Sequence, residues 1–406
     1  MLKRISQIAL IACIIMVVYY TFKYYPYCKW PDVDEEELEA FAKDCYEVTK
    51  ELNDRPKDDV LRLQTITDDL TEVISQKDMF DSDQWPPFDY RKDDKWDEHY
   101  ASIVKHDEAL KKITEDGFVF QKDAYDFDVE DTFESPILIP LRKLFSWQMA
   151  AIRYEMENGQ KDKAIFRLEA MMTIVHGLLG TPSILPLATG NYVIRKTDKT
   201  ILSIIPHLDS ADLTRIEKQR ESYPDPMDVF VKAIQDDVHF SATTIVRGLP
   251  NFVRNSAESD DYDKVDKLII FLNWIRWFER QRAVYLIAKK KQINYIRTWD
   301  ESGRNGDPVF LDPKTEFKYS IGPSIAWMKI DRIFNSTNLH EQRVKAMKTV
   351  LGWFASSEDF QALERREMEY DDKHLIVVEN GKVWMEKKGS AADGDEQSAT
   401  QGEAQP

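Results

Sequence analysis

An uncharged, apolar run directly behind the start of the chain constrains the rest of the sequence most. Residues 5–22, ISQIALIACIIMVVYYTF, contain no charged side chain, and only Ser6, Gln7 and Thr21 are clearly polar. A helix needs about 20 mainly apolar residues to cross the hydrocarbon core of a bilayer. Tyrosines gather at the far end of the run, where amphipathic rings favour the boundary between membrane and water. The run therefore predicts an N-terminal transmembrane anchor over residues 5–22.

The charges on either side of this run indicate how the anchor is oriented. Lys3 and Arg4 precede it, whereas Lys23 and Lys29 follow it and are themselves followed by an acidic stretch. Because the cytoplasmic flanks of membrane spans are enriched in Lys and Arg, this small bias places residues 1–4 in the cytoplasm. We expect a single-pass, signal-anchored protein of the bacterial inner (cytoplasmic) membrane, with the bulk of the chain in the periplasm or outside.

Two other interpretations of the run stay open. A cleaved signal peptide needs small residues at its cleavage site, and none follows Val18. A lipoprotein would carry its lipid on Cys13, because residues 10–13 are similar to a bacterial lipobox. However, apolar residues continue directly after Cys13, where lipoproteins have a polar tether. The uncleaved anchor is therefore the favoured prediction.

The composition favours a packed body and disfavours nucleic-acid binding. Apolar residues make up 43% of the chain, which is enough for a core and excludes disorder throughout. Binding of nucleic acid requires a concentrated basic surface, whereas the net charge of this chain is −17. The 14 glycines are few for 406 residues, which disfavours barrels and sandwiches with their many turns.

The cysteines and histidines indicate no metal centre and no cofactor, but they raise the question of one disulfide. Seven histidines and three cysteines are too scattered for a metal cluster, and Asp236 with His239 would supply only half of a metal site. Cys28 and Cys45 would face an oxidising compartment in the predicted orientation, where a disulfide between them can form. The alternative is two free thiols, because Cys45 falls within a predicted helix.

After a Pro-interrupted stalk over residues 23–33, the pattern up to residue 250 is that of a helical domain. Apolar residues recur at helical spacing over 141–156 and again over 164–179, which predicts a helical hairpin. Further amphipathic helices follow with short connections, so residues 34–250 are predicted as a layered, solenoid-like helical domain. Within it we expect one helix over residues 99–113 and a short strand over 117–120.

A second helical subdomain is predicted over residues 267–388, after a polar, acidic link at 251–266. Its expected helices cover 267–295, 323–334, 339–354 and a shorter stretch near 359–368. A β-hairpin follows, with Asn380 and Gly381 in the turn, because two-residue hairpin turns require positive φ. Residues 389–406 are small, acidic and polar, and they are expected to be disordered. The predicted fold class is thus all-α, with a transmembrane helix before the multi-helix ectodomain and a small β-hairpin at its end.

Several of these features together resemble a loosely defined group of uncharacterised bacterial membrane-anchored, mostly helical proteins. The features are the anchor, the hairpin from Tyr154 to Leu179, the following Pro-containing helix and the later helix pair over residues 321–343. The resemblance covers about half of the chain. Since the group has no established activity, the resemblance implies no catalytic role for any residue.

The only candidate nucleophile motif is the segment around Ser324. Residues 322–326, GPSIA, resemble G-x-S-x-G with Ala in the last position, and Asp331 and His374 follow in the order that a Ser–Asp–His triad requires. That motif belongs to doubly wound parallel sheets, and nothing in this sequence supplies the alternating strands. The favoured interpretation of Pro323 is therefore the first turn of a helix.

The helix predicted over residues 267–295 has two interpretations. Trp274 and Trp277 together with Lys289, Lys290 and Lys291 could lie on an anionic membrane or on a partner protein. Apolar residues surround nearly the whole first half of this helix, which is typical of a buried helix. Burial is the favoured prediction.

These patterns favour a membrane-tethered helical interaction or structural module over an enzyme, and they do not indicate its pathway. The expected partners are the lipid bilayer, through residues 5–22, and an unidentified protein. The alternative function is a serine hydrolase that uses Ser324.

Overall fold

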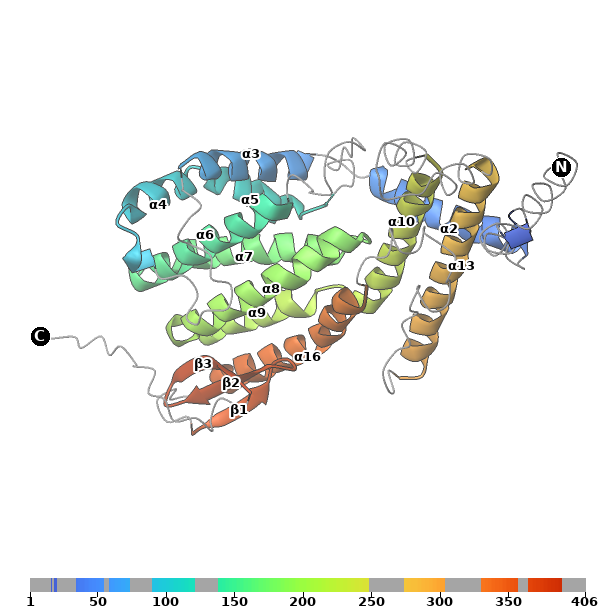
Figure 1. The fold of residues 1–406 in the computed structure, drawn as a ribbon. Coiled ribbons are helices and arrows are strands. Elements are labelled where there is room, and N and C mark those ends of the chain that lie inside the picture. The colour runs from blue at the N-terminus through green and yellow to red at the C-terminus, as the bar shows by residue number, and fades with distance from the viewer. Residues whose placement is uncertain are drawn as a thin grey trace, which may run out of the picture.

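The computed structural model describes residues 16, 18–19, 34–54, 58–73, 90–120, 138–247, 274–303, 330–356 and 364–388. Within these residues the chain is mostly helical and ends in a small antiparallel sheet, so the predicted helical body is confirmed (Figure 1). In chain order the elements are α2 (Glu35–Asn53), α3 (Asp58–Val73), α4 (Trp96–Val104), α5 (Asp107–Asp116), α6 (Leu138–Glu157), α7 (Lys161–Leu179), α8 (Ile184–Ile204), α9 (Ser210–Glu221), α10 (Pro226–Arg247), α13 (Trp274–Glu301), α16 (Ile330–Ala355), β1 (Arg366–Glu369), β2 (His374–Glu379) and β3 (Lys382–Lys387).

The predicted membrane anchor falls almost entirely outside the described residues. Of residues 5–22, only Met16, Val18 and Tyr19 are described; all three are helical and exposed. None of the described helices is both long and apolar enough to cross a bilayer, so the described part of the chain gives the predicted span no support. The predicted stalk, the link at 251–266 and the tail at 389–406 also lie outside the described residues.

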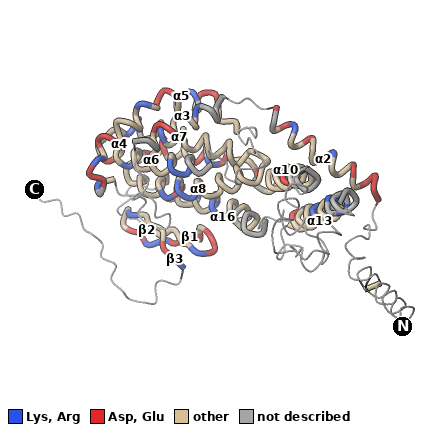
Figure 2. Tube along the Cα trace, turned by 45° about the horizontal axis from the view of Figure 1, so that its top comes forward, with Lys and Arg blue, Asp and Glu red and all other residues tan. Residues whose placement is uncertain are grey.

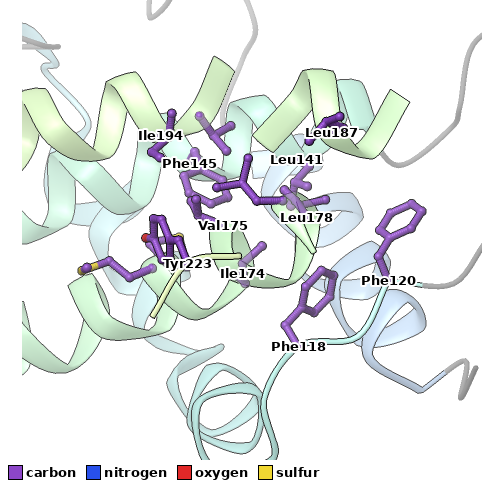
Figure 3. Packing of buried hydrophobic residues seen from close by; sticks show 14 of the residues in the cluster. Phe118, Phe120, Leu141, Phe145, Ile174, Val175, Leu178, Leu187, Ile194 and Tyr223 are labelled. Carbon is purple, nitrogen blue, oxygen red and sulfur yellow. The ribbon is translucent and has the colours of Figure 1, made fainter. Parts of the chain in front are cut away.

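Helices α6, α7 and α8 lie side by side at the centre of the body (Figure 1). The first two form the predicted hairpin, and Gly159 in their connection has a φ of 70°, which a residue with a side chain rarely adopts. Buried side chains from all three helices, among them Phe145, Val175 and Ile194, pack against one another (Figure 3). Full burial of such a side chain contributes about 1.5–3 kcal/mol to the stability of the fold. The packing of these three helices is therefore a large contribution to that stability.

Residues 117–120, predicted as a strand, are instead an extended segment that lies on α7. Phe118 and Phe120 of this segment are buried (Figure 3). A Cβ atom at Gly177 in α7 would overlap both the carbonyl oxygen and the ring of Phe118. The segment can therefore approach α7 this closely because position 177 is a glycine.

The helix predicted over residues 99–113 is two helices, α4 and α5. The chain turns at His106, whose N–H donates to the carbonyl of Ile103 at 3.2 Å. Asp107 then opens α5 with acidic residues in its first turn, where carboxylates interact favourably with the helix dipole. Periodicity alone missed this break because both helices place apolar residues at helical spacing.

Helix α10 joins the central helices to the end of the molecule that holds α2 and α13 (Figure 1). It contacts α8 and α16 as well as α2 and α13. The side chain of Asp34 caps α2 by accepting from the N–H groups of Glu36 and Glu37. Further along α2, the hydroxyl of Thr49 donates to Asp236 of α10 at 2.9 Å.

Residues 330–355 form the single helix α16, where two helices were predicted. The predicted break was the polar stretch around Asn335 and Asn338. In the fold, Thr337 within this stretch is fully buried and accepts a hydrogen bond of 3.1 Å from Asn191 of α8. The tertiary contact with α8 thus holds the polar stretch in the helix.

The C-terminal hairpin is confirmed, with a third strand that was not predicted. Strands β2 and β3 pair antiparallel, and Asn380 and Gly381 in their turn have φ angles of 50° and 74°, as a primed turn requires. Residues 366–368, expected at the end of a short helix, lie instead in strand β1, which pairs with β2. The sheet contacts α16 and α8.

Candidate functional site on helices α6 and α8

Five cations gather where α6 and α8 lie against each other, and we call this set the basic face. Residues three, four and seven positions apart on a helix share one side of it, and Tyr192, Arg195, Lys196 and Lys199 of α8 have this spacing. Figure 2 shows Lys and Arg residues along α8. Contacts and charge interactions bring Arg142, Lys196 and Lys199 together. We include in the basic face their sequence neighbours Lys143 and Arg195.

Three members of the basic face have no acidic partner in the described part of the chain. Arg142, Lys143 and Arg195 form no ion pair with any residue that the structure describes. Two buried arginines elsewhere in the fold are paired: Arg167 lies 2.8 Å from Glu155, and Arg220 lies 2.7 Å from Asp198. Exposed lysines elsewhere, such as Lys43 and Lys111, also form no ion pair with the described residues. The basic face differs from them in that Arg142, Lys196 and Lys199 lie close enough together to create a local positive potential.

Lys196 lies at the centre of the basic face and is perturbed by it. Its Nζ donates to Oγ of Ser146 at 2.6 Å and lies 5.1 Å from the centre of the Tyr192 ring. The guanidinium of Arg142 lies 4.8 Å from the same ring. Burial lowers the pKa of Lys196 to about 8, and the charges of Arg142 and Lys199 contribute to this shift. An anion bound beside these cations would stabilise their charged forms.

The pairing of Ser146 with Lys196 also has the composition of a nucleophile and its base. Ser146 is 8% exposed, however, and its Oγ also donates to the carbonyl oxygen of Arg142 at 3.3 Å. A nucleophile must reach a substrate carbonyl, and this hydroxyl is turned toward its own helix. The arrangement therefore suits the binding of an anion better than acyl transfer.

The residues predicted as a hydrolase triad are only partly described. Ser324 lies outside the described residues, and Asp331 is in the first turn of α16 with a side chain that is likewise outside them. His374 is on β2, and its Nδ1 lies 2.9 Å from Oδ1 of Asp371. The described residues therefore do not test the triad, which stays a prediction.

The three lysines predicted as one membrane or partner surface do not share an exposed face. Lys289 is fully buried in α13, and its Nζ lies 3.2 Å from Oδ2 of Asp237. Burial lowers the pKa of Lys289, although Asp237 opposes the shift. Lys290 is half-buried and lies 2.5 Å from Glu37, whereas Lys291 is exposed.

The other members of that predicted surface, Trp274 and Trp277, are in the first turn of α13, with side chains outside the described residues. The helix itself continues to Glu301, beyond its predicted end near Tyr295. A membrane or partner role for this helix stays a prediction.

Cys45 is a buried thiol in α2, and Cys28 lies outside the described residues, so the disulfide between them also stays a prediction. Burial raises the pKa of Cys45 to about 12, with contributions from Asp44 and Asp236. The described residues contain no group of three or more His, Cys, Asp and Glu that could hold a metal ion.

Sequence reasoning missed the basic face. The spacing along α8 is visible in the sequence, but exposed lysines and arginines at helical spacing are common and usually pair with nearby acids. Only the packing of α6 against α8 shows that Arg142 and Lys196 both contact the ring of Tyr192. No protein-family description, curated protein or solved structure matches the chain.

Proposed function

We propose that the protein is a membrane-tethered helical interaction module whose basic face binds an acidic segment of a protein partner. One observation carries this proposal: Arg142, Lys143 and Arg195 have no acidic partner among the described residues of a strongly acidic chain. Carboxylates from another chain would form ion pairs with these cations. Complementary charge of this kind gives specificity and speeds association.

A protein partner fits the charges better than a nucleic acid does. A polyphosphate backbone approaching the basic face would also meet the field of a chain with a net charge of −17. Binding of nucleic acid draws on many phosphate contacts. An acidic peptide segment is short enough to contact the basic face alone.

A binding measurement tests the proposal with the full chain in lipid nanodiscs. The probe is a fluorescent, glutamate-rich peptide, and the variant is Arg142→Gln/Lys143→Gln/Arg195→Gln. Partly exposed charge pairs contribute about 0.2–1 kcal/mol each, so the variant should bind roughly tenfold more weakly. The matched control, Lys111→Gln/Lys112→Gln/Lys232→Gln, removes the same charge from exposed positions elsewhere.

Equal weakening in both variants would show that the peptide responds to total charge, and it would contradict the proposal. The proposal would also be contradicted if the triple substitution left peptide binding unchanged but weakened binding to anionic vesicles. The ligand of the basic face would then be a membrane surface.

The location that we propose for this module is the bacterial inner membrane, with the anchor over residues 5–22, residues 1–4 in the cytoplasm and the remainder in the periplasm or outside. The charges flanking the anchor support this orientation. External protease added to spheroplasts should remove a tag placed after Pro406. Full protection of the tag would contradict the orientation.

Serine hydrolysis through Ser324 is the second function that we propose, and the G-x-S-x-A segment alone supports it. A fluorophosphonate probe should then label the purified protein, and the label should be lost in Ser324→Ala. If the interaction module is the correct proposal, the probe leaves Ser324 unlabelled.

A further inference from the structure

Helices α2, α10 and α13 line an open pocket of about 270 Å³. These helices lie at the opposite end of the molecule from the C-terminal sheet (Figure 1). The pocket lies apart from the basic face, which belongs to α6 and α8. The pocket is lined by Glu39, Ala42, Lys43, Cys45, Tyr46, Val238, His239, Ala242, Arg282 and Leu286.

The inner wall of the pocket is apolar and mainly aliphatic. Val238, Ala242 and Cys45 are buried, and Ala42 with Leu286 completes the wall. A protein cavity of about 150 Å³ holds one benzene molecule, so this pocket has room for roughly twice that volume. Pockets with an apolar lining and a few polar groups are typical of small-molecule sites.

The charged residues of the pocket carry an excess of one positive charge. Arg282 and Glu39 form a bidentate ion pair, with Nη1 2.6 Å from Oε1 and Nη2 3.3 Å from Oε2. This pair is neutral as a unit. Lys43 also lines the pocket and is exposed, and it forms no ion pair with the residues that the structure describes. A ligand with one negative charge would balance Lys43.

We infer that this pocket binds a medium-chain aliphatic carboxylate, with its tail on the apolar wall and its carboxylate at Lys43 beside Arg282. The pocket has room for a tail of about the length of octanoate or decanoate. The aliphatic wall favours a chain over an aromatic body, because ring faces are presented only by Tyr46 and His239, whose centres lie 5.2 Å apart and which pack on each other. The inference does not depend on the function proposed above.

Photolabelling of the full chain in nanodiscs tests the inference. The probe is decanoic acid with a diazirine at the end of its tail, and adducts are located by peptide mass spectrometry. We expect adducts on the peptides that contain Val238, Ala242 and Leu286, and we expect excess octanoate to suppress them. Decanol with the same diazirine tests whether the carboxylate is recognised.

Two variants test the charge and the volume separately. Lys43→Gln removes the exposed cation without touching the core, and it should reduce adduct formation about fivefold, since a partly exposed charge pair contributes up to about 1 kcal/mol. Lys291→Gln removes an exposed cation of α13 outside the pocket and should leave the adducts unchanged. Ala242→Leu should fill the space beside the apolar wall and abolish the adducts. The circular dichroism spectrum of this variant reports whether it folds.

The inference is overturned if decanoate labels none of these peptides, or if octanoate does not compete. It is also overturned if Lys43→Gln labels like the unaltered chain, or if the decanol probe labels the same peptides equally well, because a carboxylate site must distinguish the two. Since Lys43→Gln leaves the basic face intact, failure here is separate from failure of peptide binding.

Discussion

The hydroxyl of Tyr370 donates a hydrogen bond of 2.6 Å to Oδ2 of Asp198, joining two residues that are 172 positions apart. Arg220 of α9 donates to the same oxygen at 2.7 Å. Asp198, Arg220 and Tyr370 are all buried, so the carboxylate of Asp198 depends on these donors in place of water. The contact fixes the C-terminal sheet, whose first strand ends just before Tyr370, to helix α8.

Tyr370→Phe should lower the free energy of unfolding by about 1–3 kcal/mol, because it removes a donor from a buried carboxylate and leaves the ring in place. Urea unfolding at pH 7 measures this. Tyr295→Phe is the matched control, since Tyr295 is 42% exposed and should change stability by less than about 0.5 kcal/mol. Equal stability of the two variants would show that the hydroxyl of Tyr370 is not needed.

Lys196 should make stability rise with pH in the alkaline range. Its pKa is lowered from 10.5 to about 8 in the fold by burial and neighbouring cations. Between these values the unfolded chain binds more protons than the folded chain, so stability increases as pH rises through this window. The increase should be roughly 1–3 kcal/mol. Lys196→Met should lack it, as measured by urea unfolding from pH 7 to pH 10, and a parallel pH profile in both proteins would refute the shift.

Lys289→Met should destabilise the fold by about 3–5 kcal/mol, because it leaves the carboxylate of Asp237 buried without its cation. The exposed neighbour Lys291 provides the control, and Lys291→Met should have almost no effect on thermal or urea unfolding. Adding Asp237→Asn to Lys289→Met should recover part of the loss. If Lys291→Met proved the more damaging change, the assignment of buried and exposed faces in α13 would be wrong.

Two glycines in helices should respond to alanine in opposite directions. Gly177→Ala places a methyl group against Phe118, so we expect a loss of at least about 1–3 kcal/mol from overpacking. Gly352 in α16 has nothing within 4 Å of the added Cβ, and alanine there should stabilise the helix by about 0.5–1 kcal/mol. Thermal unfolding measures the change in stability of each variant. A Gly177→Ala variant more stable than the unaltered protein would contradict the close contact with Phe118.

Cys45 should react slowly with thiol reagents in the folded protein. Burial raises its pKa to about 12, so little thiolate is present near neutral pH. In a Cys13→Ser/Cys28→Ser background, the reaction with Ellman's reagent should be slow in buffer and fast in urea. Fast reaction of the folded protein would contradict the burial. With Cys28 restored, labelling in urea that requires prior reduction would demonstrate the disulfide.

The existence of most helices could be predicted from the sequence, because an amphipathic helix shows its buried side as a local period. Helix starts also follow local chemistry, since the side chain of Asp209 caps α9 by accepting from the N–H groups of Ala211 and Asp212. Continuity was harder to predict. The polar stretch around Thr337 stays helical because Asn191, far away in the sequence, contacts it.

The functional residues were less predictable than the helices for the same reason. Lys289 and Lys291 are equivalent in the sequence, yet one is buried beside Asp237 and the other is exposed. Likewise, nothing local indicates that Lys196 and Arg142 share the ring of Tyr192. Charge in a sequence reports composition, whereas function depends on which charges remain unpaired after packing.

The bond between Tyr370 and Asp198 also has a consequence for biosynthesis. During translation, Asp198 leaves the ribosome long before Tyr370 does, because 172 residues separate them. Helices α6 to α10 can therefore assemble while the chain is still growing, but the carboxylate of Asp198 lacks one of its donors until the last part of the message has been read. A chain cut short before residue 370 would lack this donor, so the tie between the C-terminal segment and α8 forms only when synthesis is nearly complete.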